Sequence, residues 1–403
     1  MAKYVFLNMP AYGHVNPTLA VGQELVKRGQ DVIYYLPELF QDAVQATGAV
    51  FRRYDSKLKS ISPMPITPGT MGGSLSTLMV EESRYVLPQV LESIRAEQPD
   101  YIVYGAMCLW ARIVTQVLNV PAIALRPTYA MNEHFNLSSM MAQQRNQNVP
   151  DMRDVLARVN AGMAEVCETY HVPPVDLRST FVHAEPLTIV FLPKAFQPAA
   201  DTFDERYLFV GPSILRRNEA IDFPLDALST ERPLLYISLG TVFNNQPEFF
   251  KMCFEAFGEQ PWQVVLSRGR HVDPATLGSV PDNFLVSAYV PQLDILPRAR
   301  VFVTHGGMNS VMESLYYGIP MIVIPQMPEQ AMTAQRIAEM GLGIALEKEA
   351  VDVTTLREAV ERVANEAAFR QRVQHMQQLT REAGGYQRAA DAIMQLTQEH
   401  ARV

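Results

Sequence analysis

Short apolar runs alternate with longer amphipathic stretches through both halves of the 403-residue chain, and this alternation limits the possible folds most. Buried parallel strands read as short continuous apolar runs, and the helices that connect them read as amphipathic stretches. The chain therefore predicts an α/β protein built from βα units around mostly parallel sheets. The runs of the first half are YVFL (4–7), DVIYYL (31–36), YIVY (101–104) and PAIAL (121–125).

The same rhythm restarts after a polar, proline-bearing segment that has no clear periodicity and is typical of a linker. A chain of this length suits two domains of ~200 residues each. We predict a first domain over 1–210, a linker over 211–232, a second domain over 233–384 and a C-terminal helix over 385–403. The runs of the second half are LLYISLGT (234–241), WQVVLS (262–267), VFVTHGG (301–307) and MIVIPQ (321–326).

Composition excludes several classes of protein. Hydrophobic residues make up 48% of the chain and charged residues 19%, which is enough apolar material for two cores and excludes a mostly disordered chain. The net charge of −8 and the lack of a Lys/Arg-rich block argue against a nucleic-acid partner. No apolar run is long enough for a signal peptide or a membrane span, so we expect a cytoplasmic protein without a membrane partner. The three cysteines show neither metal nor redox spacing.

The segment NMPAYGHVNPTLAVGQEL places His14 where the first strand is expected to turn into a helix. Ligands of open α/β sheets bind beyond the carboxyl ends of the strands, so a polar side chain at this position is a candidate for chemistry. The alternative is that His14 only caps the helix that would start near Asn16 and Pro17. This segment alone leaves both interpretations open.

The segment THGGMNSVMESLYYGIPMIVIPQMPEQ (304–330) predicts a second site. Two glycines and a histidine precede an expected helix start, where free N–H groups favour a phosphate or diphosphate. Glu313 follows Asn309 by one helical turn and could accept hydrogen bonds from ribose hydroxyls. A plain glycine turn with an Asn cap also explains GGMN, but it leaves Glu329 and Gln330 after the next strand unexplained.

Rival chemistries lack their motifs. The chain has no GxxxxGK[ST] phosphate loop, no HExxH metal pair and no GxSxG nucleophile turn. It has no Asp-x-Asp pair to hold a divalent ion, so a diphosphate would be neutralised by protein groups alone, without a metal or other cofactor. The first strand is not followed by GxGxxG, which disfavours a nicotinamide enzyme.

Several motifs together resemble family 1 of the nucleotide-sugar glycosyltransferases, especially the bacterial macrolide and flavonoid glucosyltransferases of the Bacillus type. The motifs are GHVNP, SLGT (238–241), YVPQLDIL (289–296), HGGMNSVMES, PQMPEQ and REAGGYQRAA. The resemblance spans nearly the whole chain. It implies a GT-B fold, with two Rossmann-like domains facing a cleft and a last helix that crosses back onto the first domain. It also implies transfer of glucose from UDP-glucose with inversion and without a metal.

The resemblance also assigns roles to individual residues. His14 matches the general base that takes the proton of the acceptor hydroxyl, a task that suits a neutral imidazole at physiological pH. Tyr289 stands where many relatives have tryptophan. The implied donor-binding residues are His305, Gly307, Asn309, Ser310 and Thr241 at the diphosphate, Glu313 at the ribose, Gln292 and Tyr289 at the uridine, and Glu329 and Gln330 at the sugar.

One departure from the family pattern concerns the base. Relatives carry an aspartate at the end of the strand YIVY that orients the histidine, whereas this chain has Gly105 there. Asp100 lies five residues earlier, ~16 Å away along an extended strand, and cannot substitute. Cys108 or a water molecule are possible partners for His14, although neither supplies a fixed negative charge. We expect weak transfer that favours phenols, because a phenol with a pKa near ~10 needs less help than an alcohol.

Two alternatives to an active glucosyltransferase remain. The first is a protein of the same fold that binds a UDP-sugar but transfers it poorly. The second is a nucleotide-sugar epimerase, which is disfavoured because such enzymes do not combine GHVNP with MPEQ.

The acceptor is not identified by the sequence, and flavonoids, phenols and macrolides all fit. The irregular segment 55–76, rich in Pro, Gly and Ser, is expected to be a loop that forms one wall of the acceptor site. Core packing is the alternative for each candidate side chain. The candidate acceptor-binding residues are Met9, Tyr12, Trp110, His134 and Phe135.

Overall fold

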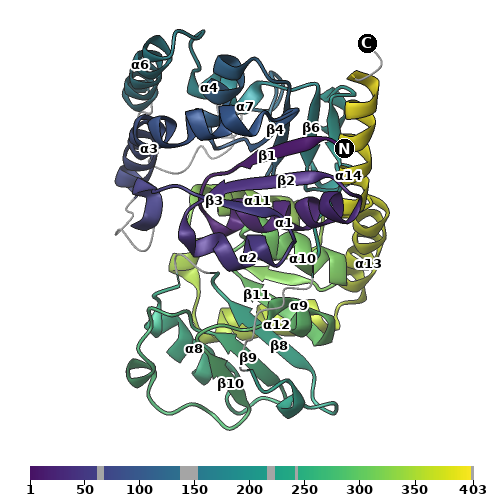
Figure 1. Ribbon diagram of the computed structural model, residues 1–403. Helices are drawn as coiled ribbons and strands as arrows, with labels where there is room; N and C mark the ends of the chain where they lie inside the picture. Colours follow the sequence, from purple (N-terminus) through teal and green to yellow (C-terminus); the bar gives the residue numbers. More distant parts are fainter. Residues whose placement is uncertain (61–67, 137–152, 216–222, 241–243, 401–403) are drawn as a thin grey trace. The chain divides into compact units, whose positions relative to one another are not determined.

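The computed structural model describes residues 1–60, 68–136, 153–215, 223–240 and 244–400. The chain divides into two compact α/β units (Figure 1). Unit 1 comprises Met1–Leu215 and Ala383–Val403, and unit 2 comprises Arg216–Glu382. The predicted linker over 211–232 includes residues 216–222, which lie outside the described residues.

The described strands of unit 1 form one sheet of seven, in which each neighbouring pair is parallel. The strand β1 lies inside the sheet between β2 and β4, and its side chains alternate between the two faces. Val5 and Leu7 join one hydrophobic core, and Tyr4 and Phe6 join the other. In spatial order the strands are β3 (Val50–Arg53), β2 (Asp31–Leu36), β1 (Lys3–Leu7), β4 (Tyr101–Gly105), β5 (Ala122–Arg126), β6 (Leu187–Val190) and β7 (Tyr207–Phe209).

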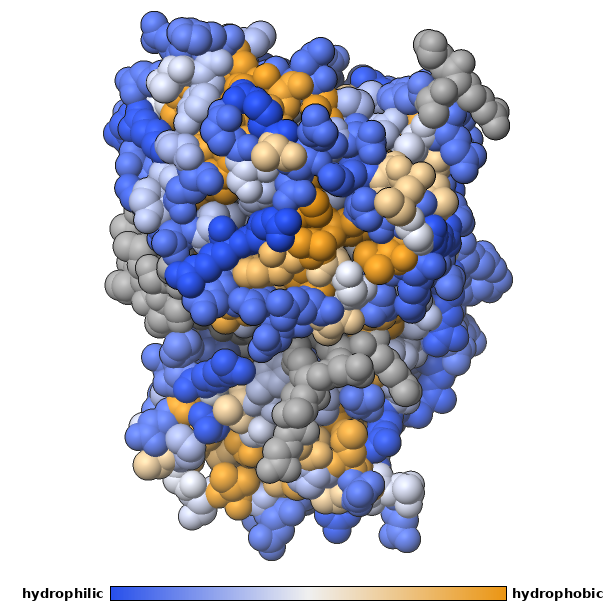
Figure 2. All heavy atoms as spheres, viewed as in Figure 1, coloured by the Kyte–Doolittle hydropathy of each residue, from blue (hydrophilic) through white to orange (hydrophobic). Residues whose placement is uncertain are grey.

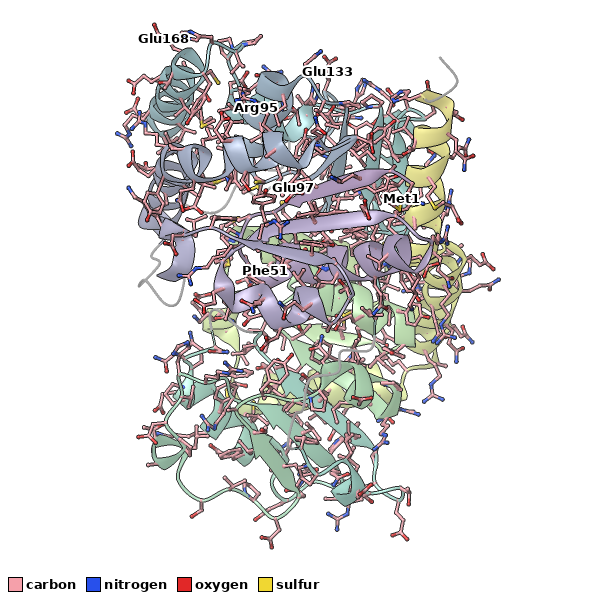
Figure 3. The ribbon with its side chains drawn as sticks, in the orientation of Figure 1. Met1, Phe51, Arg95, Glu97, Glu133 and Glu168 are labelled. Carbon is pink, nitrogen blue, oxygen red and sulfur yellow. The ribbon has the colours of Figure 1, made fainter. Side chains whose placement is uncertain are left out.

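Helices cover both faces of this sheet. The core on one face is completed by α3, α4 and α6, and the core on the other face by α1 and α14. Glu97, labelled in Figure 3, ends α3 and pairs with Arg52 of β3, with 2.8 Å between the carboxylate and the guanidinium. The described helices are α1 (Tyr12–Lys27), α2 (Gln41–Gln45), α3 (Pro68–Glu97), α4 (Leu109–Leu118), α6 (Arg153–Thr169), α7 (Leu177–Val182) and α14 (Gly385–His400).

The C-terminal helix α14 packs on unit 1, as predicted. Ala390 and Ile393 are buried in the same core as α1, and the hydroxyls of Tyr4 and Thr397 lie 2.8 Å apart. Figure 1 shows α14, in yellow, alongside this sheet. The last helix thus returns the chain to the unit in which it began.

The prediction of a loop over 55–76 is wrong from residue 68 onward, because the long helix α3 begins at Pro68. A proline in the first turn of a helix costs little, since its missing N–H has no partner within the helix there. The glycines and serines that follow suggested a loop, but α3 continues through them to Glu97. Residues 61–67 lie outside the described residues.

Unit 2 repeats the design of unit 1 with a sheet of six described strands, again parallel at each neighbouring pair. In spatial order they are β10 (Phe284–Ser287), β9 (Gln263–Ser267), β8 (Leu234–Ser238), β11 (Ala299–Thr304), β12 (Met321–Val323) and β13 (Gly343–Ala345). The described helices are α8 (Pro247–Phe257), α9 (Gln292–Ile295), α10 (Met308–Tyr317), α11 (Pro328–Glu339), α12 (Val353–Asn365) and α13 (Ala367–Glu382).

The strand order of each sheet confirms the predicted Rossmann-like architecture. Numbered within its unit, each sheet runs 3-2-1-4-5-6, the doubly wound order, and unit 1 adds a seventh strand. The order reverses between β1 and β4 in unit 1 and between β8 and β11 in unit 2. Ligands of such sheets bind beyond the carboxyl ends of the strands at this reversal, so each unit has one expected binding position.

The surface drawn in Figure 2 is mostly hydrophilic, and patches of apolar residues show through over both units. No helix in the described part of the chain is both long and apolar enough to cross a membrane.

Candidate functional site

His14 lies in the first turn of α1. This helix follows β1, one of the two strands between which the strand order of unit 1 reverses. The chain leaves β1 at Leu7, turns through residues 8–11 and starts α1 at Tyr12. The backbone N–H of Ala11 donates to the carbonyl of Met9 at 2.8 Å, and that of His14 donates to the carbonyl of Ala11 at 2.9 Å. Ala11, not His14, is the N-cap, so the interpretation of His14 as a mere helix cap is wrong.

The environment of His14 keeps its imidazole neutral. The side chain is half-buried, and burial lowers its pKa from the usual 6.5 to about 4, because a charged ring would lose its hydration. Its Nδ1 atom is buried and makes no hydrogen bond with any residue in the described ranges. The ring is therefore a neutral base at pH 7 with one nitrogen shielded from solvent.

Gly105 ends β4, which is the strand on the other side of the reversal. The register pairs Leu7 with Tyr104, so Asn8 is level with Gly105 at the carboxyl ends of the two strands. A Cβ atom built on Gly105 would stand 2.7 Å from the side-chain oxygen of Asn8. The space that an aspartate would enter at position 105 thus already contains the Asn8 carboxamide.

Sequence reasoning missed Asn8. The residue is only 1% exposed, and neither its Oδ1 nor its Nδ2 has a hydrogen-bond partner among the described residues. The available signal was its position, since Asn8 is the first polar residue after the buried run of β1. Cys108, the partner considered for His14, is buried in the core with α3, α4 and α6, whereas α1 packs in the other core.

In unit 2, His305 directly follows β11, one of the two strands between which the strand order of this unit reverses. Two glycines leave room for its ring: Cβ atoms at Gly240 or Gly307 would collide with the imidazole, at 2.5 Å in the case of Gly240. Gly240 also has a φ of +80°, which other residues rarely adopt. Burial lowers the pKa of His305 to about 4, although a hydrogen bond with the Ser238 backbone opposes this change.

The helix α10 starts with a glycine N-cap and no side-chain cap. Gly307 occupies the N-cap position, so the alternative of an Asn cap is wrong, and Asn309 and Ser310 lie in the first turn. Asn309 and Ser310 are both half-buried. Backbone N–H groups at such a start have no partner within the helix, which suits a diphosphate.

Gln292 and Glu313 are held together within unit 2. The Gln292 side-chain amide donates to the Glu313 carboxylate at 2.5 Å and to the Ser310 hydroxyl at 3.3 Å. The Tyr236 hydroxyl donates to the Gln292 carbonyl oxygen at 3.2 Å. Glu313 is nearly buried at 7% exposure, so this network fixes the two groups assigned to the nucleoside. Sequence reasoning did not include Tyr236, which lies inside an apolar strand.

The remaining donor-binding predictions differ in their surroundings. Gln330 is buried in the first turn of α11, and its side-chain oxygen accepts from the backbone N–H of Gln326 at 2.8 Å. Glu329 is exposed beside it, and Tyr289 is half-buried in the loop before α9. Thr241 lies outside the described residues.

The candidate acceptor-binding residues fall into two groups. Tyr12 is 43% exposed and packs edge-on against Phe40, and His134 is also exposed. Met9, Trp110 and Phe135 are buried; Trp110 packs edge-on against Tyr54 within a hydrophobic core. Core packing accounts for Trp110, and the exposed residues keep their side chains available.

Within the described ranges, no group of three or more His, Cys, Asp or Glu side chains is arranged to hold a metal ion. The groups near the expected diphosphate position are instead a histidine, small polar side chains and a helix N-terminus.

Comparison with known proteins shows the family to which the chain belongs. The family model for UDP-glucoronosyl and UDP-glucosyl transferase matches residues 224–383. The chain is 42% identical to the NDP-glycosyltransferase YjiC of Bacillus subtilis (strain 168), over 98% of this chain and 97% of that protein. It is 33% identical to the oleandomycin glycosyltransferase of Streptomyces antibioticus, over 100% of this chain and 92% of that protein. Among solved structures, the calicheamicin glycosyltransferase CalG4 matches with a TM-score of 0.83 and 34% identity, over 100% of this chain and 99% of that one.

Proposed function

Because this chain belongs to family 1 of the glycosyltransferases, we propose that it transfers glucose from UDP-glucose to a hydroxyl group of a small hydrophobic acceptor. The observation that carries this proposal is the neutral imidazole of His14 at the strand-order reversal of unit 1. In this proposal unit 1 supplies the base and unit 2 binds the donor.

The base acts through one ring nitrogen. Since Nδ1 of His14 is buried, Nε2 is the atom left to take the proton from the acceptor hydroxyl. The acceptor oxygen then forms a bond to the anomeric carbon while the bond from that carbon to the UDP oxygen breaks. Attack from the side opposite the leaving group inverts the anomeric centre, and UDP leaves with the electron pair of the broken bond.

The donor is held by neutral dipoles and hydrogen bonds in unit 2. The N-terminus of α10, with Asn309 and Ser310, and the ring of His305 suit the diphosphate, because each offers N–H or O–H donors to its negative charge. Glu313, already fixed by Gln292, suits the ribose hydroxyls as an acceptor. Thr241, Gly307, Tyr289, Glu329 and Gln330 complete the proposed donor site. No metal or other cofactor takes part in this proposal.

The weakness of the base favours acidic acceptors. A base with a pKa of about 4 removes a proton poorly from an aliphatic alcohol and more easily from a phenol, whose pKa is near ~10. We therefore place phenols and flavonoids before macrolide alcohols among the acceptors. The similarity to the oleandomycin glycosyltransferase keeps macrolides as the second class.

The proposal is tested by incubating the protein with UDP-glucose and a flavonol and following both UDP and the glycoside. UDP and a glycoside of inverted configuration, identified by NMR of the anomeric proton, are expected in equal amounts. UDP-glucose binding in calorimetry without any glycoside would instead support the alternative of a UDP-sugar-binding protein. Release of UDP together with an altered free sugar would instead support the alternative of a nucleotide-sugar epimerase.

A further inference from the structure

Three buried polar atoms near the strand-order reversal of unit 1 have no hydrogen-bond partner in the described structure. They are Oδ1 and Nδ2 of Asn8 and Nδ1 of His14. Buried polar atoms nearly always form hydrogen bonds, and exceptions often mark a functional site. Asn8 directly follows β1 and His14 lies in the first turn of α1, so the two residues are six positions apart on the same connection.

The proposed reaction requires a particular tautomer of His14. If Nε2 is to take the proton from the hydroxyl of the substrate, the neutral ring must carry its own hydrogen on Nδ1. Because Nδ1 is buried, that N–H needs an acceptor from the protein. Without one, the ring can hold its hydrogen on Nε2 instead, and the base is then inactive.

The Asn8 side chain occupies the space that a side chain at position 105 would enter, and position 105 is where the family resemblance expects the partner of the histidine. Its Oδ1 lies 2.7 Å from the point where a Cβ on Gly105 would stand, and the residue is almost wholly buried. Any side chain at position 105 would therefore displace the Asn8 carboxamide. The glycine and the asparagine are complementary, because the glycine leaves the space free and the asparagine fills it with an oxygen that can accept a hydrogen bond.

The neighbouring charged groups do not compete for this role. Asp100 lies at the opposite end of β4, where its carboxylate accepts the backbone N–H of Lys3 at 2.7 Å. Glu185 accepts the hydroxyl of Tyr104 at 2.6 Å and lies near His183. Arg126 ends β5 and offers only donors.

We propose that Asn8 is the positioning residue of His14, its Oδ1 accepting the Nδ1 hydrogen in place of the carboxylate that position 105 lacks. This inference rests on the proposed function, since it assigns His14 the role of base. The two side chains are not bonded in the described structure, so this role requires the Asn8 carboxamide to turn toward the ring, and the bond then fixes the active tautomer. A neutral amide does not stabilise the positive charge that forms on the ring, so the chain keeps activity but favours acidic acceptors.

The kinetic test compares the wild type with Asn8→Ala, Gly105→Asp and the double variant. Asn8→Ala is expected to lower kcat for a flavonol about tenfold, the effect of one neutral hydrogen bond, with KM for UDP-glucose unchanged. Gly105→Asp in the Asn8→Ala background is expected to restore kcat to the wild-type value or above, because a carboxylate replaces the amide. The acid limb of kcat/KM is expected to move to higher pH only in the two carboxylate-bearing variants.

Thr188→Val is the matched control. Thr188 is fully buried in β6 of the same sheet, and its hydroxyl also lacks a partner among the described residues, so this variant removes a comparable polar atom away from His14. Its kcat and pH profile are expected to equal those of the wild type. The inference is overturned if Asn8→Ala matches the wild type, or if the double variant stays as slow as Asn8→Ala.

A second measurement needs no Asn8 variant. Nitrogen NMR of the imidazoles at pH 7, with His14 assigned by its loss in His14→Gln, shows which ring nitrogen carries the hydrogen. Hydrogen on Nδ1 supports the inference, and hydrogen on Nε2 overturns it. If the wild type binds UDP-glucose but forms no glycoside, the proposed function fails instead, and the NMR result still decides which tautomer His14 adopts.

Discussion

Asn8 and Gly105 share one space at the carboxyl ends of two neighbouring strands, since the Asn8 Oδ1 atom lies 2.7 Å from where a Cβ on Gly105 would stand. Real Cβ atoms do not approach other atoms so closely. The atom in the way is the end of a side chain and not backbone, so rotation of Asn8 can make room. A substitution at Gly105 therefore tests the base directly, with a limited steric effect.

We predict that Gly105→Asp raises kcat for a flavonol by about a hundredfold, the effect of a hydrogen bond between charged groups. The new carboxylate favours the protonated form of His14 and so raises its pKa above the present value of about 4. The loss of rate on acidification should then begin at a higher pH than in the wild type. A pH series of kcat/KM measures both changes, and an unchanged profile would show that position 105 does not influence the base.

The preference among acceptors should change in the same variant. A stronger base helps an alcohol more than a phenol, because the phenol already gives up its proton readily. The ratio of flavonol to alkyl-alcohol rates is expected to fall in Gly105→Asp. If the wild type already glycosylates alcohols as fast as phenols, the explanation of a weakened base is wrong.

His14→Gln is predicted to lower kcat by about 10²- to 10⁴-fold, the usual contribution of a general base. Glutamine suits the third position of a helix, so α1 should form normally. The affinity for UDP-glucose is expected to stay the same, because the proposed donor-binding residues all belong to unit 2. Calorimetry with UDP-glucose is the control. Turnover close to that of the wild type would exclude His14 as the base.

Tyr236→Phe tests the network that fixes Gln292 and Glu313. The variant removes a hydrogen bond of 3.2 Å to Gln292 but keeps the ring, which stacks on Phe302 with 4.7 Å between centroids. One neutral hydrogen bond corresponds to a rise of up to about tenfold in KM for UDP-glucose. The value of kcat should change little, because Tyr236 belongs to unit 2 whereas the proposed base belongs to unit 1. A fall in kcat at constant KM would contradict the role given to Gln292.

Most of the fold could be predicted from the sequence, because its central strands are buried on both faces. Apolar runs such as residues 4–7 and 101–104 became β1 and β4, and the C-terminal helix packs on unit 1 as expected. Some strands were missed, among them the buried inner strand β6 (Leu187–Val190) and the edge strand β3. The strand β3 (Val50–Arg53) is largely exposed and ends in two arginines, so it lacks the apolar run of a central strand.

The site residues that belong to a sequence motif could be predicted, whereas those brought together by the packing of the fold could not. The positions of His14, His305 and Gln292 follow from motifs that resemble a known family. The meeting of Asn8 with Gly105 joins residues 97 positions apart through the register of β1 with β4, and no local pattern encodes it. The sequence also showed that a carboxylate is missing at residue 105, but only the fold shows what fills its space.

The stability of the protein should fall on mild acidification because of its buried histidines. Burial lowers the pKa of His14 and of His305 from 6.5 to about 4, so the unfolded chain binds protons more readily than the folded one between these values. The contribution of the two neutral histidines to the free energy of unfolding is fully present above pH 6.5, and it is lost progressively as the pH falls toward 4. At pH 5 each histidine accounts for a loss of about 2 kcal/mol.

The contribution of His14 can be isolated by fluorescence. The chain has two tryptophans, Trp110 in unit 1 and Trp262 in unit 2, and both are buried. In a Trp262→Phe background, Trp110 reports the unfolding of unit 1 alone in urea. Adding His14→Gln is expected to reduce the loss of stability between pH 7 and pH 5 by about 2 kcal/mol. Since the other titrating groups of unit 1 are present in both proteins, equal losses would show that His14 is hydrated and titrates normally in the folded state.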